Sequence, residues 1–301
     1  MQHLPRVSEI FGARRILILA PHPDDEIVAC DVAALRALAA GARVFVLYLT
    51  TGVPGPETLW PWQRASHAAR VRRRRVEAQA AAALTGLEPV GFLGWPSRRL
   101  REHLDEAESE IAKAIETCAA EALWVPAFEG AHQDHDAANA LAARFRDSLL
   151  VWEFAAYNFA GGRVQANRFP AERGGETVLD PTPAEAAQKR RALACYASER
   201  GNLRHIRVER EACRPLPCHV YAAPPHPGRL FRERFHWVPF RHPRIDFAAS
   251  AKIYAAIGRW ASARGGAARP LGESPGGEPG QSDREFARAL DQPQRERGLD
   301  R

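Results

Sequence analysis

An alternation of short apolar runs with longer helical patterns through the first half of the chain constrains the fold most. The apolar runs have the length of buried strands. We expect strands at Arg14–Ala20, Arg43–Thr50, Val90–Leu93, Leu123–Pro126 and Leu149–Phe154. We expect helices at Ile27–Ala40, Arg70–Leu84, Glu102–Ala120 and Asp136–Arg146. This order is typical of an α/β fold, a three-layer Rossmann-like arrangement with a mostly parallel sheet and helices on both faces.

The second half of the chain has weaker patterns. We expect a helix at Pro183–Ala197, and short strands and loops within Arg207–Pro239. From Ser262 the chain turns to glycine, proline, serine and mixed charge, a composition that cannot bury a core. The sequence therefore predicts one folded domain over residues 1–261 and a disordered tail over residues 262–301, with at most a short helix at Asp283–Leu290.

The chain carries a modest positive excess, with 42 basic and 36 acidic residues and a formal net charge of +6. The two signs balance from Arg264 onward, so the excess belongs to the earlier part. An excess of this size suits an anionic ligand or a nucleic-acid surface but identifies neither. An arginine-rich surface on an ordinary globular protein is the simpler interpretation.

Cysteine usage and hydropathy bear on the compartment. The five cysteines are irregularly spaced and form no CxxC pair, which argues against a disulfide framework and predicts a reduced, cytoplasmic setting. Cys213 and Cys218, with His226 and His236 downstream, lack the spacing of common zinc sites. The most apolar stretch, Ile16–Ala20, is far shorter than the ~20 residues of a membrane helix. No targeting segment is visible, so we expect no membrane segment.

The first cluster with chemical potential is the segment Pro21–Glu26, directly after the first expected strand. His22 and Asp25 offer an imidazole nitrogen and a carboxylate oxygen, two of the ligand types that zinc takes. Adjacent carboxylates cannot easily share a small site unless a cation relieves their repulsion. A metal bound to Asp25 would give that relief and leave Asp24 free as a general base.

The second cluster, His132–His135, follows the strand that ends at Pro126. His135 would complete a set of two histidines and one carboxylate, which leaves an open position for water, as in catalytic zinc sites. His132 could polarise a carbonyl or protonate a departing amine. Asp134 could hold one histidine in the required tautomer.

Each cluster also has a plain structural interpretation. Asp24 or Asp25 could cap the helix that begins near Ile27, and His132–His135 could be a polar loop before a helix. Ligands of α/β sheets bind at the carboxyl ends of the strands, and both clusters lie at such ends. Coincidence is therefore the less attractive explanation for the pair.

Three further residues are weaker candidates for substrate binding. Arg74 belongs to an arginine-rich run, Arg70–Arg75, that could contact an anionic group or simply form a solvated helix face. Trp60 and Trp62 follow the second expected strand and could stack on a sugar or pack locally.

The chain resembles the LmbE-like or PIG-L family of zinc-dependent N-acetylglucosaminyl deacetylases. The resemblance covers about Arg14–Ser198 and rests on Pro21–Glu26, His132–His135, Arg74–Glu77 and Lys189–Leu193 with Tyr196 and Ser198. The first motif is highly specific, and the first two together are more so. Gln133 departs from the family pattern, in which many members carry proline, and this leaves the aim of His132 less fixed.

The resemblance implies a Rossmann-like sheet, one catalytic zinc ion per chain and hydrolysis of N-acyl groups on glucosamine derivatives. It implies zinc ligation by His22, Asp25 and His135, a general base at Asp24, and polarisation or acid catalysis by His132 supported by Asp134. The implied partner is a small amino sugar. It would be anionic if the arginines of Arg70–Arg75 or Arg200–Arg244 border the pocket.

Two other functions stay open from the residues alone. The same metal site could hydrolyse a phosphate or carboxylic ester. A non-enzymatic polyanion-binding protein is the second alternative, but no nucleic-acid motif supports it. The sequence does not determine the oligomeric state.

Overall fold

Five parallel strands form the centre of the sheet, as the alternation of apolar runs predicts. A computed structural model describes residues 12–172 and 174–264. The strands are β1 (Arg15–Ala20), β2 (Arg43–Tyr48), β3 (Glu88–Phe92), β4 (Ala122–Pro126) and β5 (Leu150–Phe154). The sheet continues through β9 (Glu211–Pro215) to β8 (Thr177–Leu179), in the order β3-β2-β1-β4-β5-β9-β8. Strand β9 runs antiparallel to both of its neighbours.

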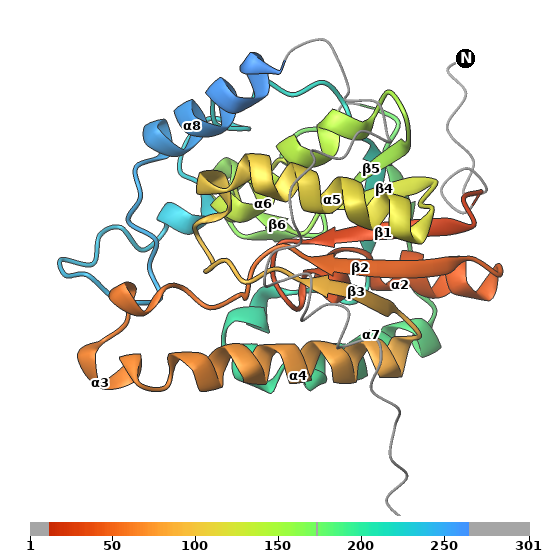
Figure 1. Cartoon of the computed structure of the whole chain (residues 1–301), viewed down its shortest axis with the longest axis horizontal. Helices are drawn as coiled ribbons and strands as arrows, with labels where there is room; N and C mark the ends of the chain where they lie inside the picture. Colours follow the sequence, from red (N-terminus) through yellow and green to blue (C-terminus); the bar gives the residue numbers. More distant parts are fainter. Residues whose placement is uncertain (1–11, 173, 265–301) are drawn as a thin grey trace, which may run out of the picture. The chain divides into compact units, whose positions relative to one another are not determined.

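Helices cover both faces of the sheet (Figure 1). One face carries α2 (Asp25–Ala39), α4 (His67–Thr85) and α7 (Pro183–Cys195). The other carries α5 (Leu104–Cys118) and α6 (Gln133–Ala142), with α8 (Ser250–Ala263) packed on α6. The expected three-layer α/β fold is therefore confirmed.

Burial on both faces explains why the strands read as unbroken apolar runs. In β1, Ile16 and Ile18 pack into the core under α2, α4 and α7, whereas Leu17 and Leu19 pack into the core under α5 and α6. All four side chains are buried. A parallel sheet covered on both faces needs apolar residues at every position, not alternate ones.

The boundaries differ from the expected ones where local capping decides them. Helix α6 begins at Gln133, three residues before the expected Asp136, because the His132 side chain accepts a hydrogen bond from Asp134 N and caps it.

Helix α8 and strand β8 were not predicted. The remaining short elements are α3 (Pro61–Arg64), β6 (Tyr157–Asn158), β7 (Gln165–Ala166) and 3₁₀ turns at Pro56–Thr58, Leu100–Glu102, Ala143–Phe145, Ala160–Gly162, Ala197–Glu199, Asn202–His205 and Phe231–Glu233.

The predicted tail lies almost wholly outside the described residues. Helix α8 continues to Ala263, so its last turn includes the first two residues of the segment assigned to the tail. The expected disorder beyond residue 264 and the possible helix at Asp283–Leu290 fall where the structure describes nothing. No helix in the described part is both long and apolar enough to span a membrane.

Strand order places the two chemical clusters side by side. Strands β1 and β4 are adjacent and parallel, so the segments that follow their carboxyl ends emerge at one edge of the sheet. These segments are Pro21–Asp24 and Ala127–His132. The loops after β2 and β3 leave the same edge, the one toward α3 in Figure 1. Ligands of parallel α/β sheets bind there.

Candidate metal centre

The turn between β1 and α2 aims the first cluster at the sheet edge. Within it, Asp24 has a φ of 134°, a region that side chains with a Cβ atom rarely adopt. Two hydrogen bonds hold the turn: Glu26 Oε2 accepts from Asp24 N at 3.1 Å, and Asp25 Oδ2 accepts from His22 N at 2.8 Å. Such backbone strain persists only where the surroundings enforce it, often at functional sites.

His22, Asp25 and His135 converge as the sequence predicts. His22 Nδ1 lies 3.0 Å from Asp25 Oδ2, and His135 Nε2 lies 3.1 Å from Asp25 Oδ1. The three ligand atoms lie within 4.8 Å of one another, and all three residues are buried. Two imidazole nitrogens and a carboxylate oxygen can therefore face one point.

The hydrogen bonding of His135 shows what this point lacks. Both of its ring nitrogens are buried: Nδ1 has no partner in the described part of the chain, and Nε2 faces only the Asp25 carboxylate, which it shares with His22. A buried polar group without a partner costs free energy, so native proteins rarely retain one without a reason. A zinc ion accepts this donor set of two imidazoles and one carboxylate. The residues present therefore fit the metal that the sequence implies.

The charges of the cluster support the same conclusion. Burial lowers the pKa of His22, but the carboxylates of Asp25 and Asp134 overcome it and raise that pKa to about 10. Burial disfavours the charged form of Asp25 too and so raises its pKa, but His135 and His22 lower that pKa well below the ordinary range. The cluster thus favours positive charge at its centre, which a bound divalent cation would supply in place of the proton.

Asp134 orients His22. Its Oδ2 lies 3.0 Å from His22 Nε2, on the ring side opposite to Asp25. The loop after β3 fixes this carboxylate: Arg98 N donates to Oδ2 at 2.6 Å and Leu100 N donates to Oδ1 at 3.2 Å. Ser97 Oγ also lies 3.1 Å from His22 Nε2. A carboxylate behind a ligand histidine fixes its tautomer and ring orientation.

His132 both caps α6 and stands beside the metal ligands. Its Nδ1 accepts a hydrogen bond from Asp134 N at 3.1 Å, so in the neutral ring Nε2 carries the proton. Burial and the charge of His22 hold the pKa of His132 well below its ordinary value. The ring centroids of His132 and His22 are 4.5 Å apart. His132 can therefore offer a neutral N–H donor at the site.

Gln133 does not loosen this segment, although it departs from the family pattern. Its side chain is buried, its amide Nε2 donates to Asp246 Oδ2 at 2.5 Å, and its Oε1 accepts from Arg101. These contacts fix the backbone between His132 and Asp134, so the expectation of a less fixed aim for His132 was wrong.

Arg74 contacts Asp24 and lies beneath the turn. It is only 3% exposed, its Nη2 lies 3.1 Å from Asp24 Oδ2, and its Nη1 lies 3.5 Å from Glu199 Oε1. Asp24 makes no capping hydrogen bond to α2, so its carboxylate is not a helix cap. Burial raises the pKa of Asp24 to about 7, and the charge of Arg74 opposes that rise.

The remaining motifs of the resemblance support the same turn. Glu77 accepts hydrogen bonds from Ser198 N at 2.9 Å and from Ser198 Oγ at 2.5 Å, which ties α4 to the segment after α7. The Tyr196 hydroxyl donates to Glu26 Oε1, and the Arg74 guanidinium lies 5.6 Å from the centre of the Tyr196 ring. Segments far apart in sequence thus converge beneath Asp24.

An aromatic wall, which the sequence did not reveal, borders the metal centre. It consists of Tyr157, His205 and Phe231, whose ring centroids lie 4.5–4.9 Å apart. Tyr157 contacts His135, with 5.6 Å between ring centroids. The guanidinium carbon of Arg234 lies 3.2 Å from the centre of the Phe231 ring. Only Tyr157, which follows β5 at a carboxyl strand end, could have been suspected from its position.

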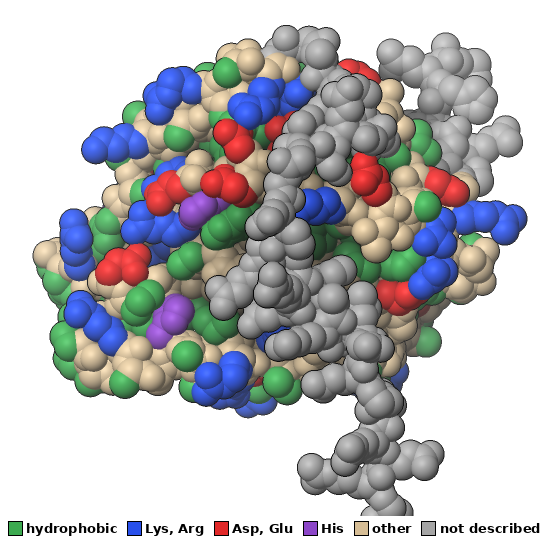
Figure 2. All heavy atoms as spheres, in the orientation of Figure 1, with side chains coloured by type: hydrophobic (Ala, Val, Ile, Leu, Met, Phe, Trp, Pro, Cys, Tyr) green, Lys and Arg blue, Asp and Glu red, His purple; other side chains and the backbone are tan. Residues whose placement is uncertain are grey.

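Trp60 and Trp62 contact each other. Their rings stack with centroids 5.3 Å apart and planes 6° apart, and the edge of His242 meets Trp60 at 6.2 Å. Trp62 is 74% exposed. A role in sugar binding remains a prediction. The other arginines of the run Arg70–Arg75 are largely solvent-facing on α4, and basic and acidic side chains are interspersed on the face shown in Figure 2.

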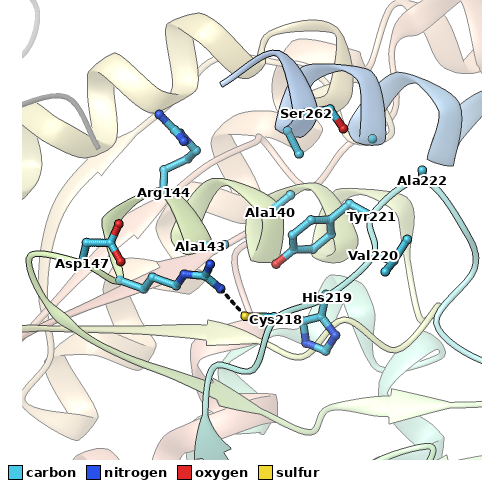
Figure 3. Close-up of a pocket in the computed structure, with 13 residues that line it drawn as sticks. Ala140, Ala143, Arg144, Asp147, Cys218, His219, Val220, Tyr221, Ala222 and Ser262 are labelled. Carbon is cyan, nitrogen blue, oxygen red and sulfur yellow. Dashed lines mark hydrogen bonds between the residues drawn. The ribbon is translucent and has the colours of Figure 1, made fainter. Parts of the chain in front are cut away.

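A separate hollow of about 330 Å³ lies between α6, the segment 218–222 and α8 (Figure 3). Arg146 donates to Cys218 Sγ there at 3.1 Å, and Tyr221 and Ser262 also line it. None of the metal-centre residues lines this hollow. All five cysteines are free, and none belongs to a metal-binding group of the described residues.

Known structures with a similar fold match about two thirds of the chain. No curated protein matches the sequence. A crystal structure of a deacetylase of teicoplanin biosynthesis superposes with a TM-score of 0.54 at 20% identity, over 67% of this chain and 97% of that one. A zinc-inhibited form of teicoplanin deacetylase gives a TM-score of 0.51 at 19% identity, over 67% and 97%. The A40926 pseudoaglycone deacetylase gives 0.51 at 20% identity, over 67% and 96%.

The similar structures show the fold, and a family model matches the region that carries the two clusters. Residues 17–145 match the family model described as PIG-L, GlcNAc-PI de-N-acetylase. The match includes both clusters and the helix that carries Arg74. This part of the chain is therefore similar to a PIG-L domain, as the resemblance to the LmbE-like family implies.

Proposed function

We propose that this protein is a zinc-dependent hydrolase that removes an N-acyl group, most simply acetyl, from an amino-sugar derivative. One observation carries the proposal: His22, Asp25 and His135 converge on one point, with Asp24 next to them. The family description and the names of the three similar structures given above, which are deacetylases, support this reaction class.

His22, Asp25 and His135 would hold the metal, and Asp134 would keep His22 in the required orientation. A zinc ion held there would supply Lewis acidity toward the amide carbonyl and the attacking water. Side chains of this protein would carry out the proton transfers and donate the hydrogen bond to the carbonyl oxygen.

Asp24 would accept a proton from the attacking water. Its carboxylate is buried, and its pKa of about 7 makes it a stronger base than an ordinary aspartate while Arg74 keeps it in place. A base with a pKa near the working pH transfers protons efficiently. The proton would pass to the amine nitrogen as the carbon–nitrogen bond breaks, which gives a carboxylic acid and a free amine.

His132 would donate its Nε2 proton in a hydrogen bond to the carbonyl oxygen as negative charge develops. The ring is set for this because Nδ1 already accepts from Asp134 N. A neutral imidazole of this kind can stabilise an oxyanion by donating a hydrogen bond, without any change in its own protonation state.

The test is to strip the full-length protein of metal, restore zinc and incubate it with a panel of N-acetylated amino sugars. We expect release of acetate and free amine that disappears with a chelator and returns with zinc. Release of phosphate or alcohol from ester substrates, with no amine from any amide, would replace this function with that of an esterase.

A further inference from the structure

Three polar groups beside the metal centre keep hydrogen-bonding atoms that no residue in the described part of the chain satisfies. The aromatic wall carries the Tyr157 hydroxyl, which makes no hydrogen bond to any residue in the described ranges. His205 Nε2 is buried and also has no hydrogen-bond partner there. Arg234 faces no carboxylate within these ranges, and the one hydrogen bond it donates goes to the Phe231 carbonyl oxygen at 3.1 Å.

These groups come from three distant segments that meet at one place. Tyr157 belongs to β6, His205 ends a 3₁₀ turn and Arg234 follows the turn Phe231–Glu233. The Phe231 ring lies between them, in contact with both aromatic rings and under the guanidinium. Through Tyr157 the group adjoins His135, so a molecule on the metal centre would reach it.

The chemistry of two of these groups points to an anion, because a tyrosine hydroxyl and a guanidinium are donors. The neutral His205 ring keeps its proton on the nitrogen that faces the Asn202 backbone, so its Nε2 is an acceptor, suited to a hydroxyl of the sugar. The guanidinium of Arg234 is half-buried above an aromatic ring, where it is weakly hydrated and held in one plane. Arginine in such a setting binds phosphate and carboxylate through paired hydrogen bonds.

The other arginines near the site are already committed. Arg74 is buried against Asp24 and Glu199. Arg98 donates from Nη1 to the Ile245 carbonyl oxygen at 3.2 Å and, unlike Arg234, also faces the carboxylates of Asp246 and Asp134. Arg101 is engaged by Arg98 O, Gln133 and Glu102. The positive excess seen in the sequence therefore bears on the metal centre chiefly through Arg234.

We propose that Tyr157 and Arg234 form a subsite that binds a phosphate or carboxylate group of the substrate, with His205 Nε2 beside them as an acceptor for a sugar hydroxyl, so that the preferred amino sugar is anionic. This inference rests on the proposed function for the identity of the sugar. It adds to that function the substrate's charge and the side chain that selects it.

Binding to the zinc-loaded full-length protein tests the subsite without turnover. Glucosamine, glucosamine 6-phosphate and muramic acid are amines already, so calorimetry measures their affinity alone. We expect one of the two anionic sugars to bind roughly tenfold to a hundredfold more tightly than glucosamine. The tighter one identifies the anion as phosphate or carboxylate. Equal affinity for all three sugars would overturn the proposal.

Substitutions assign the preference to these residues. Arg234→Gln should remove most of it, Tyr157→Phe should reduce it, and Arg234→Lys should keep part of it because the charge remains. Arg241→Gln is the matched control, since Arg241 is exposed in the same segment. If Arg241→Gln lowers the preference as much as Arg234→Gln, general electrostatics is responsible and the subsite is refuted.

Melting temperatures identify any variant that fails to fold, and Tyr157→Phe then provides the test in place of Arg234→Gln. Amine release from the matched N-acetyl sugars separates the two proposals. An Arg234-dependent preference in binding, with no amine released from any sugar, would refute the proposed function and leave the subsite. Equal turnover of neutral and anionic sugars, unchanged by Arg234→Gln, would do the reverse.

Discussion

Two buried carboxylate–histidine clusters lie on the same sheet, and only one of them is suited to bind a metal. In the first, Asp25 lies between His22 and His135 at the carboxyl end of β1. In the second, Glu153 of β5 accepts hydrogen bonds from Arg214 Nε at 2.7 Å and from His219 Nε2 at 2.9 Å. Both carboxylates are buried, so residue types and burial alone do not tell them apart.

The completeness of the hydrogen bonding distinguishes the two clusters. Glu153 also accepts from Asn139 Nδ2 at 2.9 Å, and the positive charge of Arg214 compensates its own, so that cluster is closed. In the Asp25 cluster, His135 Nδ1 is buried and has no partner in the described part of the chain, and His135 Nε2 faces only the shared Asp25 carboxylate. A closed cluster stabilises the fold, whereas an open one indicates where a ligand belongs.

The largest expected effect tests this difference directly. His135→Ala should abolish stoichiometric zinc binding and with it the activity, because one of three ligands is lost. His219→Ala should leave the zinc content unchanged and lower the free energy of unfolding by about 1–3 kcal/mol, because Glu153 loses a buried partner. Elemental analysis and thermal unfolding measure the two effects. Full zinc occupancy in His135→Ala would show that the open cluster is not the metal site.

The next effect separates the base from the ligands. Asp24→Asn preserves the shape of the side chain and leaves His22, Asp25 and His135 in place. We expect the zinc content to be unchanged and turnover to fall by ~10²–10⁴, the usual cost of removing a general base. The measurement is kcat at saturating substrate, with zinc content as the control. Turnover close to that of the wild type would assign Asp24 a purely structural role in the strained turn.

A smaller effect is expected for Asp134, which contacts a proposed metal ligand and is not itself one. Asp134→Asn keeps a hydrogen-bonding group beside His22 but removes the charge that fixes its tautomer. We expect zinc affinity or activity to fall by ~10–100-fold, as is usual for the carboxylate behind a ligand histidine. A competition assay with a chelating dye measures the affinity. Affinity equal to that of the wild type would show that Ser97 and the loop after β3 suffice to orient His22.

Much of this site could be predicted from the sequence because its residues lie in short, specific motifs at strand ends. The strand pattern gave the sheet, and parallel order placed Pro21–Glu26 near His132–His135. The central strands and most helices were predicted because their apolar periodicity is local. Helix α8 and strands β8 and β9 were harder, since they lie among proline and arginine residues and depend on contacts with the completed sheet.

The role of Arg74 and the aromatic wall could not be predicted for a related reason. The Arg74–Glu77 motif singles out Arg74 from a run of arginines, but its burial against Asp24 follows from tertiary packing. Tyr157, His205 and Phe231 are separated by dozens of residues and share no motif. Their proximity follows from where loops return to the sheet edge, which periodicity does not encode.

The smallest effect concerns a carboxylate that belongs to neither kind of cluster. Asp31 in α2 is fully buried, and neither of its oxygens has a hydrogen-bond partner in the described part of the chain. Burial raises its pKa from 3.8 to about 7, Lys189 opposes the rise and Glu211 adds to it. The folded protein therefore holds this proton more tightly than the unfolded chain does. That contribution to stability is complete below about pH 4 and is lost as the pH rises toward 7.

Asp31→Asn cannot titrate, so its stability relative to the wild type should grow between pH 5 and pH 8, by on the order of 1 kcal/mol after relaxation around the charge. Glu116→Gln, an exposed acid on α5, should show no such trend. Denaturant unfolding at several pH values measures the difference. A constant difference across that range would mean that Asp31 is ionised throughout, with a partner such as water that satisfies its oxygens.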